Sequence, residues 1–243
     1  MPIAMVTGAG IRVGRAIALA LADAGYDLIL HAHKSQNEVK AVADDILKLN
    51  RQVTLVSADL SCASQVDALA AEVIKQHQVI DVLVNSAGAY TKVPFTQLSR
   101  AEYSQMMAIN LEAPLFLIQS LLPLLNAAKA PCVINITDAA VNKPYAGYTH
   151  YMISKAALQM LTKTLALELA PHIRVNAIAP GTIAFPDNFA NDKRQRIVAH
   201  IPLARTGQVE DIGNAVVYLA RDANFITGHS LCIDGGNSLS AVG

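Results

Sequence analysis

Tyr151 and Lys155 have the residue types and the spacing needed to exchange protons with a substrate. On a helix, residues four positions apart lie on the same face, one turn from each other. An ammonium group near a phenol favours the phenolate, so we expect Lys155 to lower the pKa of Tyr151 from about 10 toward neutrality. Among the 7 tyrosines, only Tyr151 has a lysine four positions later. The pair predicts a proton-transferring site.

A glycine-rich segment follows the first strand-like segment of the chain. Residues 8–14 read Gly-Ala-Gly-Ile-Arg-Val-Gly and lead into an apolar, periodic stretch. Glycines at a strand-to-helix junction let the backbone approach a pyrophosphate, whose charge the helix N-terminus stabilises. Gly8 allows the tight turn, and Gly14 lets the helix pack closely. Glycines also end strands for structural reasons, but their place at the first junction predicts a dinucleotide site.

The end of the second expected strand favours NADPH as the cofactor. An NAD-selective protein places an acidic residue there to bind the ribose 2′-hydroxyl. Residues 31–35 read His-Ala-His-Lys-Ser and contain no carboxylate. Donors and positive charge for a 2′-phosphate are instead available from two turns: Arg12, His33, Lys34 and Ser35. The alternative is a solvated basic turn without a ligand.

Two further turns follow expected strands. Asp59 and Leu60 follow the third strand, and residues 85–88, Asn-Ser-Ala-Gly, follow the fourth. Because the carboxyl ends of parallel strands meet at one edge of a sheet, these turns lie where the adenine and ribose of a dinucleotide bind. Helix capping and turn formation are their structural alternatives.

Short β-branched runs alternate with helix-length segments along the whole chain. This alternation predicts one α/β domain over residues 1–243, a Rossmann-type doubly wound parallel sheet of about seven strands with helices on both faces. We expect strands at residues 3–7, 27–31, 53–57, 81–85, 132–137, 174–179 and 230–234. We expect helices at residues 14–24, 37–49, 65–76, 100–125, 155–170 and 209–220.

Residues 181–205 interrupt the alternation. They contain Pro186, Asp187 and Asn188, followed by a charged run at residues 192–196. Long segments of this kind in compact domains are often functional, and ligands of this fold bind outside the carboxyl ends of the strands. We therefore expect a mobile flap that covers the substrate.

The composition argues against several classes of protein. The 19 basic and 19 acidic residues balance, which leaves no basic excess for binding nucleic acid. The most apolar stretch, residues 111–125, contains Glu112 and is too short to cross a bilayer, so we expect a buried helix and no membrane partner. The N-terminus lacks a secretory signal pattern, which predicts a cytoplasmic protein. Cys62, Cys132 and Cys232 have no CxxC spacing, so we expect neither a disulfide framework nor a metal site.

Taken together, these motifs resemble the short-chain dehydrogenase/reductase family over essentially the whole chain. They are Thr7-Gly8-x3-Arg12-x-Gly14, Asn85-Ser86-Ala87-Gly88, Asn110, Tyr151-x3-Lys155 and Pro180-Gly181. The resemblance implies that Tyr151 donates a proton, Lys155 binds the nicotinamide ribose, and Asn110 supports a proton-relay water. The cofactor-binding residues expected from the motifs and turns are Gly8, Arg12, Val13, Gly14, His33, Lys34, Ser35, Asp59, Leu60, Asn85, Ala87, Tyr151, Lys155, Pro180 and Gly181.

Two departures from the general family pattern resemble pteridine reductases, as do residues 31–35. Arg12 stands at the middle glycine of the family's cofactor turn, and Asp138 stands where the family has a serine, thirteen residues before Tyr151. The resemblance implies an active site of Asp138, Tyr151 and Lys155. It also places a pterin substrate against an aromatic residue after the fourth strand. Tyr90 holds that position, and Tyr148 is a second candidate for the pocket lining.

Asp138 changes the chemistry that the site supports. A serine hydroxyl donates a hydrogen bond to a carbonyl oxygen that gains negative charge, whereas an ionised aspartate only accepts and repels that charge. A pterin offers C=N bonds and an edge rich in N–H groups, so Asp138 accepts from the substrate while Tyr151 protonates nitrogen. The alternatives are an Asp138 that only caps the following turn, and a protonated Asp138 that imitates serine.

The sequence therefore predicts an NADPH-dependent reductase that converts a dihydropterin to a tetrahydropterin, with oxidised pterin and dihydrofolate as further substrates. Tyr90, Asp138 and Tyr151 are the expected substrate-binding residues. One alternative is a ketoreductase acting on a 3-oxoacyl thioester. Another is a non-catalytic NADPH-binding sensor whose flap contacts a partner protein.

The resemblance also implies a homotetramer in which helices 100–125 and 155–170 pack against their counterparts. Four leucines of the second helix recur at helical spacing and suit either such an interface or the core: Leu158, Leu161, Leu165 and Leu169.

Overall fold

The computed structural model describes residues 1–185 and 190–239 and contains one sheet of seven parallel strands. The strand order is β3-β2-β1-β4-β5-β6-β7. The strands are β1 Ile3–Thr7, β2 Asp27–His31, β3 Val53–Val56, β4 Val82–Asn85, β5 Cys132–Ile136, β6 Arg174–Pro180 and β7 Ser230–Ile233. This arrangement confirms the predicted doubly wound α/β fold, and each strand lies within one or two residues of its predicted bounds.

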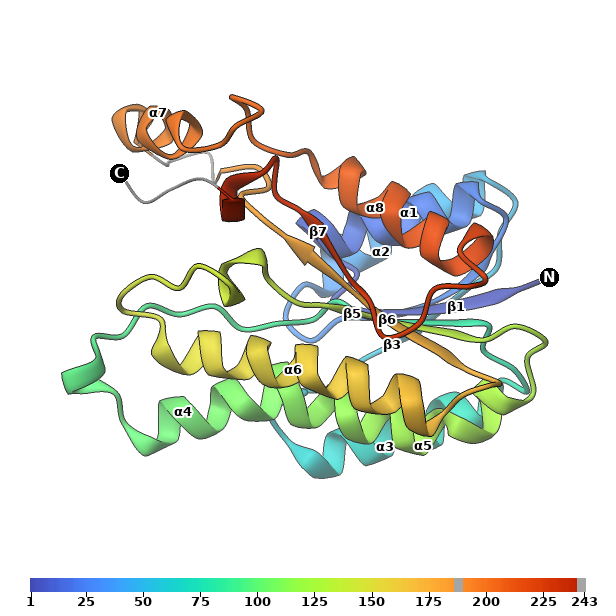
Figure 1. Cartoon of the computed structure of the whole chain (residues 1–243). Helices are drawn as coiled ribbons and strands as arrows, with labels where there is room; N and C mark the ends of the chain where they lie inside the picture. Colours follow the sequence, from blue (N-terminus) through green and yellow to red (C-terminus); the bar gives the residue numbers. More distant parts are fainter. Residues whose placement is uncertain (186–189, 240–243) are drawn as a thin grey trace.

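Helices cover both faces of the sheet (Figure 1). One layer contains α1 Arg12–Asp23, α2 Gln36–Lys48 and α8 Val209–Val217, and the other contains α3 Ala63–Gln76, α4 Arg100–Met107, α5 Ala113–Asn126 and α6 Thr149–Glu168. β4 and β5 are buried along their whole length, as their continuous apolar runs predict for central parallel strands.

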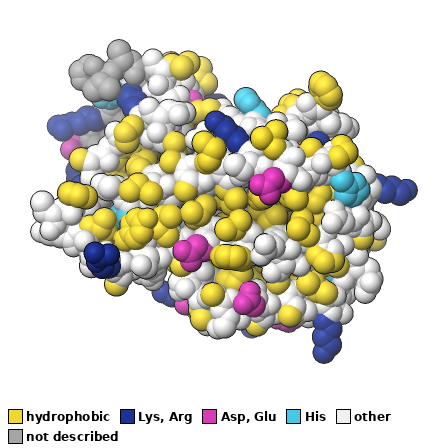
Figure 2. Space-filling view, turned by 60° about the horizontal axis from the view of Figure 1, so that its bottom comes forward, with side chains coloured by type: hydrophobic (Ala, Val, Ile, Leu, Met, Phe, Trp, Pro, Cys, Tyr) yellow, Lys and Arg dark blue, Asp and Glu magenta, His cyan; other side chains and the backbone are white. Residues whose placement is uncertain are grey.

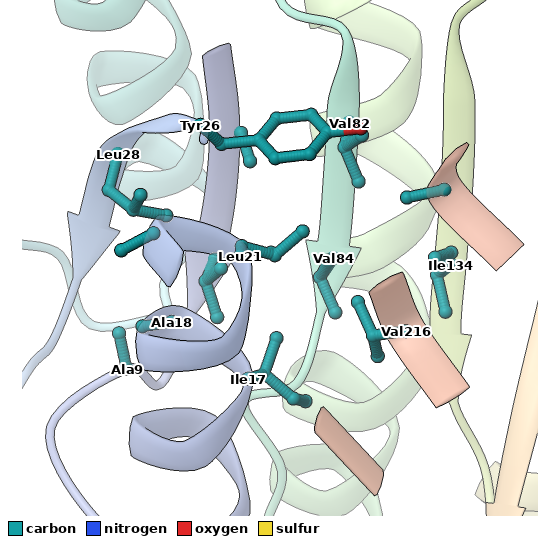
Figure 3. Packing of buried hydrophobic residues seen from close by; sticks show 14 of the residues in the cluster. Ala9, Ile17, Ala18, Leu21, Tyr26, Leu28, Val82, Val84, Ile134 and Val216 are labelled. Atoms are coloured by element: carbon teal, nitrogen blue, oxygen red, sulfur yellow. The ribbon is translucent and has the colours of Figure 1, made fainter. Parts of the chain in front are cut away.

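Side chains that alternate along each strand divide the core into two halves. Ala4 and Val6 of β1 face the α1 side, whereas Met5 between them packs on the α3 and α5 side. In Figure 3, Ile17 and Leu21 of α1 lie over the sheet near Val216 of α8. Burial of these aliphatic side chains contributes roughly 1.5–3 kcal/mol each relative to exposure. The packed core holds the carboxyl ends of the strands, and thus the site, in a fixed arrangement.

The long apolar helix keeps its predicted bounds of 100–125 to within one residue. α4, a π-helical turn at Ala108–Glu112 and α5 run on from one another, so residues 100–126 form a helix long and apolar enough to cross a membrane. The expectation that this stretch is too short was therefore wrong. Its inner face nevertheless lies in the core, where Leu117, Ile118 and Leu121 are fully buried, as expected for a core helix of an α/β fold.

α6 begins at Thr149, six residues before the predicted start. Tyr151 therefore lies in the first turn of the helix and Lys155 in the second, as the four-residue spacing predicted.

The segment predicted as a flap contains a helix that the sequence analysis missed, α7 Asn191–Ala199, which lies beyond the carboxyl ends of the strands in Figure 1. Asp192 in its first turn and Arg196 in its last complement the helix dipole. No α7 residue is buried, so the helix lacks the apolar periodicity that reveals other helices. Pro186, Asp187 and Asn188 lie outside the described residues.

Candidate active site

A cleft opens at the carboxyl edge of the sheet, where the strand order reverses between β1 and β4. In doubly wound folds this switch point is where ligands bind. The cleft has a volume of about 390 Å³. Nine of the predicted cofactor residues line it: Gly8, Arg12, Val13, Gly14, His33, Ser35, Asp59, Leu60 and Ala87. Residues that the prediction omitted also line it: Ile11, His31, Ala32, Ser86, Gly88 and Ile109.

The turn after β1 has room only for glycine at two positions. Gly8 has a φ of 66°, and a methyl group on it would lie 2.8 Å from the Cα of Ala87. A methyl group on Gly14 would lie 2.0 Å from the carbonyl oxygen of Gly8. Close packing of the turn therefore requires glycine at both positions, and the turn lines the cleft at the N-terminus of α1.

Arg12 occupies a backbone conformation that favours glycine, with a φ of 48°. Its guanidinium donates to the carbonyl oxygen of Ala184 at 3.0 Å and contacts that of Ile183 at 3.5 Å. The side chain thus connects the cofactor turn to the segment after β6. The other basic groups, His33 and Lys34, are exposed after β2, and His33 Nδ1 lies 3.8 Å from Asp59 Oδ1.

Three of the predicted cofactor residues have structural contacts. Asn85 donates to Asn135 Oδ1 at 2.8 Å inside the sheet. Asp59 accepts two hydrogen bonds from Ser61, from its amide at 2.9 Å and its hydroxyl at 2.7 Å. Gly181 lies against β7, where a methyl group would come within 2.5 Å of Asp234 Cβ. These contacts give the three residues a part in the fold: Asp59 forms a turn, and Asn85 and Gly181 pack against neighbouring strands.

Asp138 joins the turn after β5 to the catalytic tyrosine predicted on α6. Tyr151 Oη donates to Asp138 Oδ2 at 2.5 Å, while Asp138 Oδ1 accepts from the amide of Ala140 at 2.7 Å. Each carboxylate oxygen has a different partner, so Asp138 caps the short helix Ala139–Val141 and pairs with Tyr151 at the same time. Asp138 can therefore cap the following turn and interact with Tyr151 at once, so these two interpretations are compatible.

The expected lowering of the Tyr151 pKa was wrong. The tyrosine is 6% exposed, and burial raises its pKa above the ordinary value of 10.0; the charge of Asp138 raises it further. Lys155 Nζ lies 6.0 Å from the centre of the Tyr151 ring and donates to the carbonyl oxygen of Ile136 at 2.8 Å. Burial lowers the pKa of Lys155 from 10.5 to about 8. Tyr151 therefore holds its proton, which is the state required of an acid.

Asn110 lies in the π-helical turn and is fully buried. Its Oδ1 accepts from the amide of Ala89 at 2.8 Å, and its Nδ2 donates to the carbonyl oxygen of Ala89 at 3.0 Å and to Ser154 Oγ at 2.9 Å. These contacts hold the loop after β4 against α6. Asn110 thereby fixes the residue that follows Ala89, which is Tyr90.

Four tyrosines, Tyr151 among them, form a cluster of aromatic rings that we call the aromatic wall. The Tyr90 ring stacks on Tyr148 with centroids 4.7 Å apart and meets Tyr151 edge-on at 4.8 Å. Tyr90 is 55% exposed, and its hydroxyl lies 3.1 Å from that of Tyr145. Sequence reasoning missed Tyr145, although Tyr145, Tyr148 and Tyr151 are spaced by three residues. Stacked and edge-on contacts of this kind are the arrangements that aromatic rings prefer, and they hold the four rings together.

A dinucleotide-type cleft beside a buried Tyr–Lys pair defines an α/β oxidoreductase site. Residues 8–238 match the family described as enoyl-(acyl carrier protein) reductase. The chain belongs to the short-chain dehydrogenase/reductase family. It is 35% identical over 239 residues, 96% of each chain, to the 3-oxoacyl-[acyl-carrier-protein] reductase FabG of Staphylococcus aureus.

Solved structures of similar chains contain bound cofactors. FolM alternative dihydrofolate reductase 1 from Brucella canis, complexed with NADP, has a TM-score of 0.90 and 32% identity over 100% of this chain and 96% of its own. A blue fluorescent protein from a metagenomic library, in complex with NADPH, has a TM-score of 0.90 and 32% identity over 97% of both chains.

Proposed function

We propose that this protein is an NADPH-dependent reductase of a pterin or dihydrofolate-type substrate. The observation that carries the proposal is the hydrogen bond from Tyr151 to Asp138, which places a carboxylate where a ketone-reducing site needs a donor. The aromatic wall supports a flat ring as substrate, with Tyr90 and Tyr148 as its surface. The FolM structure supports it further, since that protein is described as a dihydrofolate reductase.

The cleft suits NADPH as cofactor. Gly8 and Gly14 line the cleft and let the turn pack closely at the N-terminus of α1, which suits a pyrophosphate. His33, Lys34 and Ser35 follow β2 without a carboxylate, which suits a 2′-phosphate. Gly8, Arg12, Val13, Gly14, His33, Lys34, Ser35, Asp59, Leu60, Asn85, Ala87, Pro180 and Gly181 would hold the cofactor, with Tyr151 and Lys155 at its nicotinamide end. When bound, NADPH supplies the hydride for the substrate carbon.

In this proposal, residues of this chain supply the proton that the substrate nitrogen gains. In the free protein, Asp138 accepts the Tyr151 hydroxyl hydrogen. An amino or ring N–H group of a pterin can replace the phenol as donor to Asp138, because a carboxylate accepts several hydrogen bonds. The released Tyr151 hydroxyl then donates its proton to the ring nitrogen of the reduced C=N bond. Lys155, close to the ring, offsets the phenolate charge, and the relay role of Asn110 stays a prediction.

A ketoreductase is the second candidate, favoured by the 35% identity to a 3-oxoacyl-[acyl-carrier-protein] reductase. Its carbonyl oxygen would gain negative charge beside Asp138, which repels it. NADPH oxidation with dihydrobiopterin, dihydrofolate and an acetoacetyl thioester separates the two candidates. We expect turnover of the pterin or folate and none of the thioester; turnover of the thioester alone would overturn the proposal. NADPH binding without turnover of any of them would instead favour the sensor.

Exchanging Asp138 for Ser should reverse this preference. Loss of a hydrogen bond to a charged group costs about 1.5–3 kcal/mol, so we expect dihydropterin turnover to fall by roughly 10–100-fold. Thioester turnover should appear, because the serine hydroxyl donates to a carbonyl oxygen. Asp138→Ala is the matched control: it removes the carboxylate without adding a hydrogen-bond donor, so it should lower pterin turnover without supporting the thioester. Equal pterin turnover in all three proteins would contradict the role of Asp138.

Exchanging Gly14 for Ala should weaken cofactor binding at the turn. The new methyl group would overlap the Gly8 carbonyl, and relief of such a clash typically costs about 1–3 kcal/mol. We expect the Kd for NADPH to rise at least about tenfold, as measured by NADPH fluorescence. Gly25→Ala is the control, because Gly25 has a φ of 101° but no neighbour within 4 Å of the new methyl group. It should lower stability and leave the Kd unchanged. An unchanged Kd in Gly14→Ala would place the phosphates elsewhere.

The homotetramer and a cytoplasmic location also stay proposals. Of the four leucines expected to suit an interface or the core, Leu158 is buried, and Leu165 and Leu169 pack against the core. Exposed apolar side chains at a seven-residue spacing on α6 are Ile153, Met160 and Leu167. Figure 2 shows apolar side chains over much of the face of the molecule that carries α4, α5 and α6. An exposed apolar face supports association of several copies of this chain. Measurement of the molecular mass in solution tests this.

A further inference from the structure

His31, the last residue of β2, is a buried histidine that connects three strand ends. The residue is only 2% exposed. Nδ1 lies 3.3 Å from the amide nitrogen of Gly8, after β1, and Nε2 lies 3.0 Å from the carbonyl oxygen of Ala58, after β3. The main-chain oxygen of His31 also accepts from the amide of Ala9 at 2.9 Å. Two successive amides of the cofactor turn are thus held by one residue.

The partners of the ring determine its protonation. A carbonyl oxygen only accepts hydrogen bonds, so Nε2 must carry a proton to donate to Ala58. An amide N–H only donates, so Nδ1 must present its lone pair to Gly8. Only the neutral ring with its proton on Nε2 satisfies both contacts. A second proton, on Nδ1, would face the N–H of Gly8 and remove that hydrogen bond.

We propose that His31 is a positioning residue for the cofactor: its neutral ring holds the phosphate-binding turn at Gly8, and protonation of Nδ1 releases the turn and weakens NADPH binding. This inference rests on the proposed use of NADPH, but not on the identity of the substrate. Gly8 is a sensitive point, because its positive φ and close approach to Ala87 leave few other conformations. A small loss of support there shifts a turn that lines the cleft.

The surroundings of His31 favour the neutral ring at neutral pH. Burial lowers its pKa from the ordinary 6.5, the Ala58 carbonyl opposes this shift, and His33 lowers the pKa further. The other charged groups at this end of the cleft have partners elsewhere: Asp59 pairs with His33, and Arg12 contacts the carbonyls after β6. Lys34, in the same turn as His33, is exposed. The proposal therefore predicts loss of affinity on the acidic side only.

Two substitutions separate the two ring contacts without introducing a titrating group. His31→Asn retains an acceptor oxygen near the position of Nδ1, whereas His31→Gln retains an N–H donor near that of Nε2. The Kd for NADPH is measured by its fluorescence between about pH 5 and 8, the interval in which histidine titrates. Wild type should lose affinity by up to about tenfold per pH unit below the pKa of His31. His31→Asn should match the wild-type Kd at neutral pH and show no such loss. His31→Gln should bind about tenfold more weakly at every pH.

NADPH itself titrates in this interval, because the second pKa of a phosphate monoester is about 6. NADH lacks the 2′-phosphate, so the same titration with NADH isolates the contribution of the protein. His229→Gln removes an exposed histidine just before β7, outside the residues that line the cleft, and should leave the NADH profile unchanged. Thermal unfolding without cofactor checks that each variant folds.

A wild-type NADH profile without acid loss would overturn the proposal, as would an acid loss that persists in His31→Asn or a His31→Gln that binds like wild type. Failure of the proposed function gives a different result. In that case NADPH and NADH bind with the predicted pH dependence, and no pterin or folate is turned over. A protein that binds neither nucleotide would overturn both.

Discussion

Tyr151→Phe is expected to lower kcat for a dihydropterin by about 10³-fold, within the range for loss of a general acid. Phe keeps the ring that Tyr90 meets edge-on but removes the hydroxyl that donates to Asp138. Because the cofactor turn follows β1 whereas Tyr151 lies on α6, the Kd for NADPH should stay within about threefold of that of wild type. Steady-state kinetics and NADPH fluorescence together measure this separation of chemistry from binding.

Tyr103→Phe provides the matched control. Tyr103 is exposed on α4 and is not among the tyrosines whose rings contact Tyr151, and the substitution removes the same chemical group. Its kcat should equal that of wild type. If Tyr151→Phe retained kcat within about tenfold of wild type, the proton would come from another group, and the assignment of Tyr151 as the acid would be wrong.

Lys155→Met is expected to lower kcat by at least about 10²-fold, because the phenolate formed beside Asp138 would lose its nearby positive charge. The same change should alter stability in a direction that depends on pH. Lys155 is 5% exposed, and its pKa falls from 10.5 to about 8 on folding. The unfolded chain therefore binds this proton more tightly than the folded protein does. Below about pH 8 the buried ammonium destabilises the fold, and between about pH 8 and 10.5 this cost disappears.

Urea unfolding at several pH values tests this sign. A shift of one pKa unit corresponds to about 1.4 kcal/mol, so the free energy of unfolding of wild type should rise relative to Lys155→Met by about 3 kcal/mol between pH 8 and 10.5. Lys163→Met, an exposed change on the same helix, should show no such difference. A constant difference between wild type and Lys155→Met would mean that the lysine is solvated in the folded protein.

Several features of the site were determined by local rules that a sequence carries. The glycines of the cofactor turn follow directly after an apolar strand, and Tyr151 and Lys155 share a helix face through their spacing alone. The strand bounds follow from apolar runs that alternate with amphipathic segments. α7 escaped this reasoning because it buries no residue. The membrane-spanning length was misjudged because only residues 111–125 of the predicted helix 100–125 were considered.

The pKa of Tyr151 shows the limit of pairwise reasoning. Spacing brought a lysine near the phenol and predicted a lowered pKa, but spacing contains no information about burial. In the folded protein, desolvation and the Asp138 carboxylate act together against the phenolate. The same holds for Asp138, whose two oxygens take two partners from different segments.

The sequence by itself determined the doubly wound fold, the position of the dinucleotide turn and the Tyr–Lys pair, because each depends on neighbours within a few residues or on one repeating pattern. Only the tertiary structure decided that His31 supports Gly8, that Asn110 holds the loop of Tyr90, and that Tyr145 joins the aromatic wall. These contacts join strand ends and loops 21 to 55 residues apart along the chain. Hydrogen bonding and burial at such separations depend on how the strands are ordered in the sheet, which no local pattern specifies.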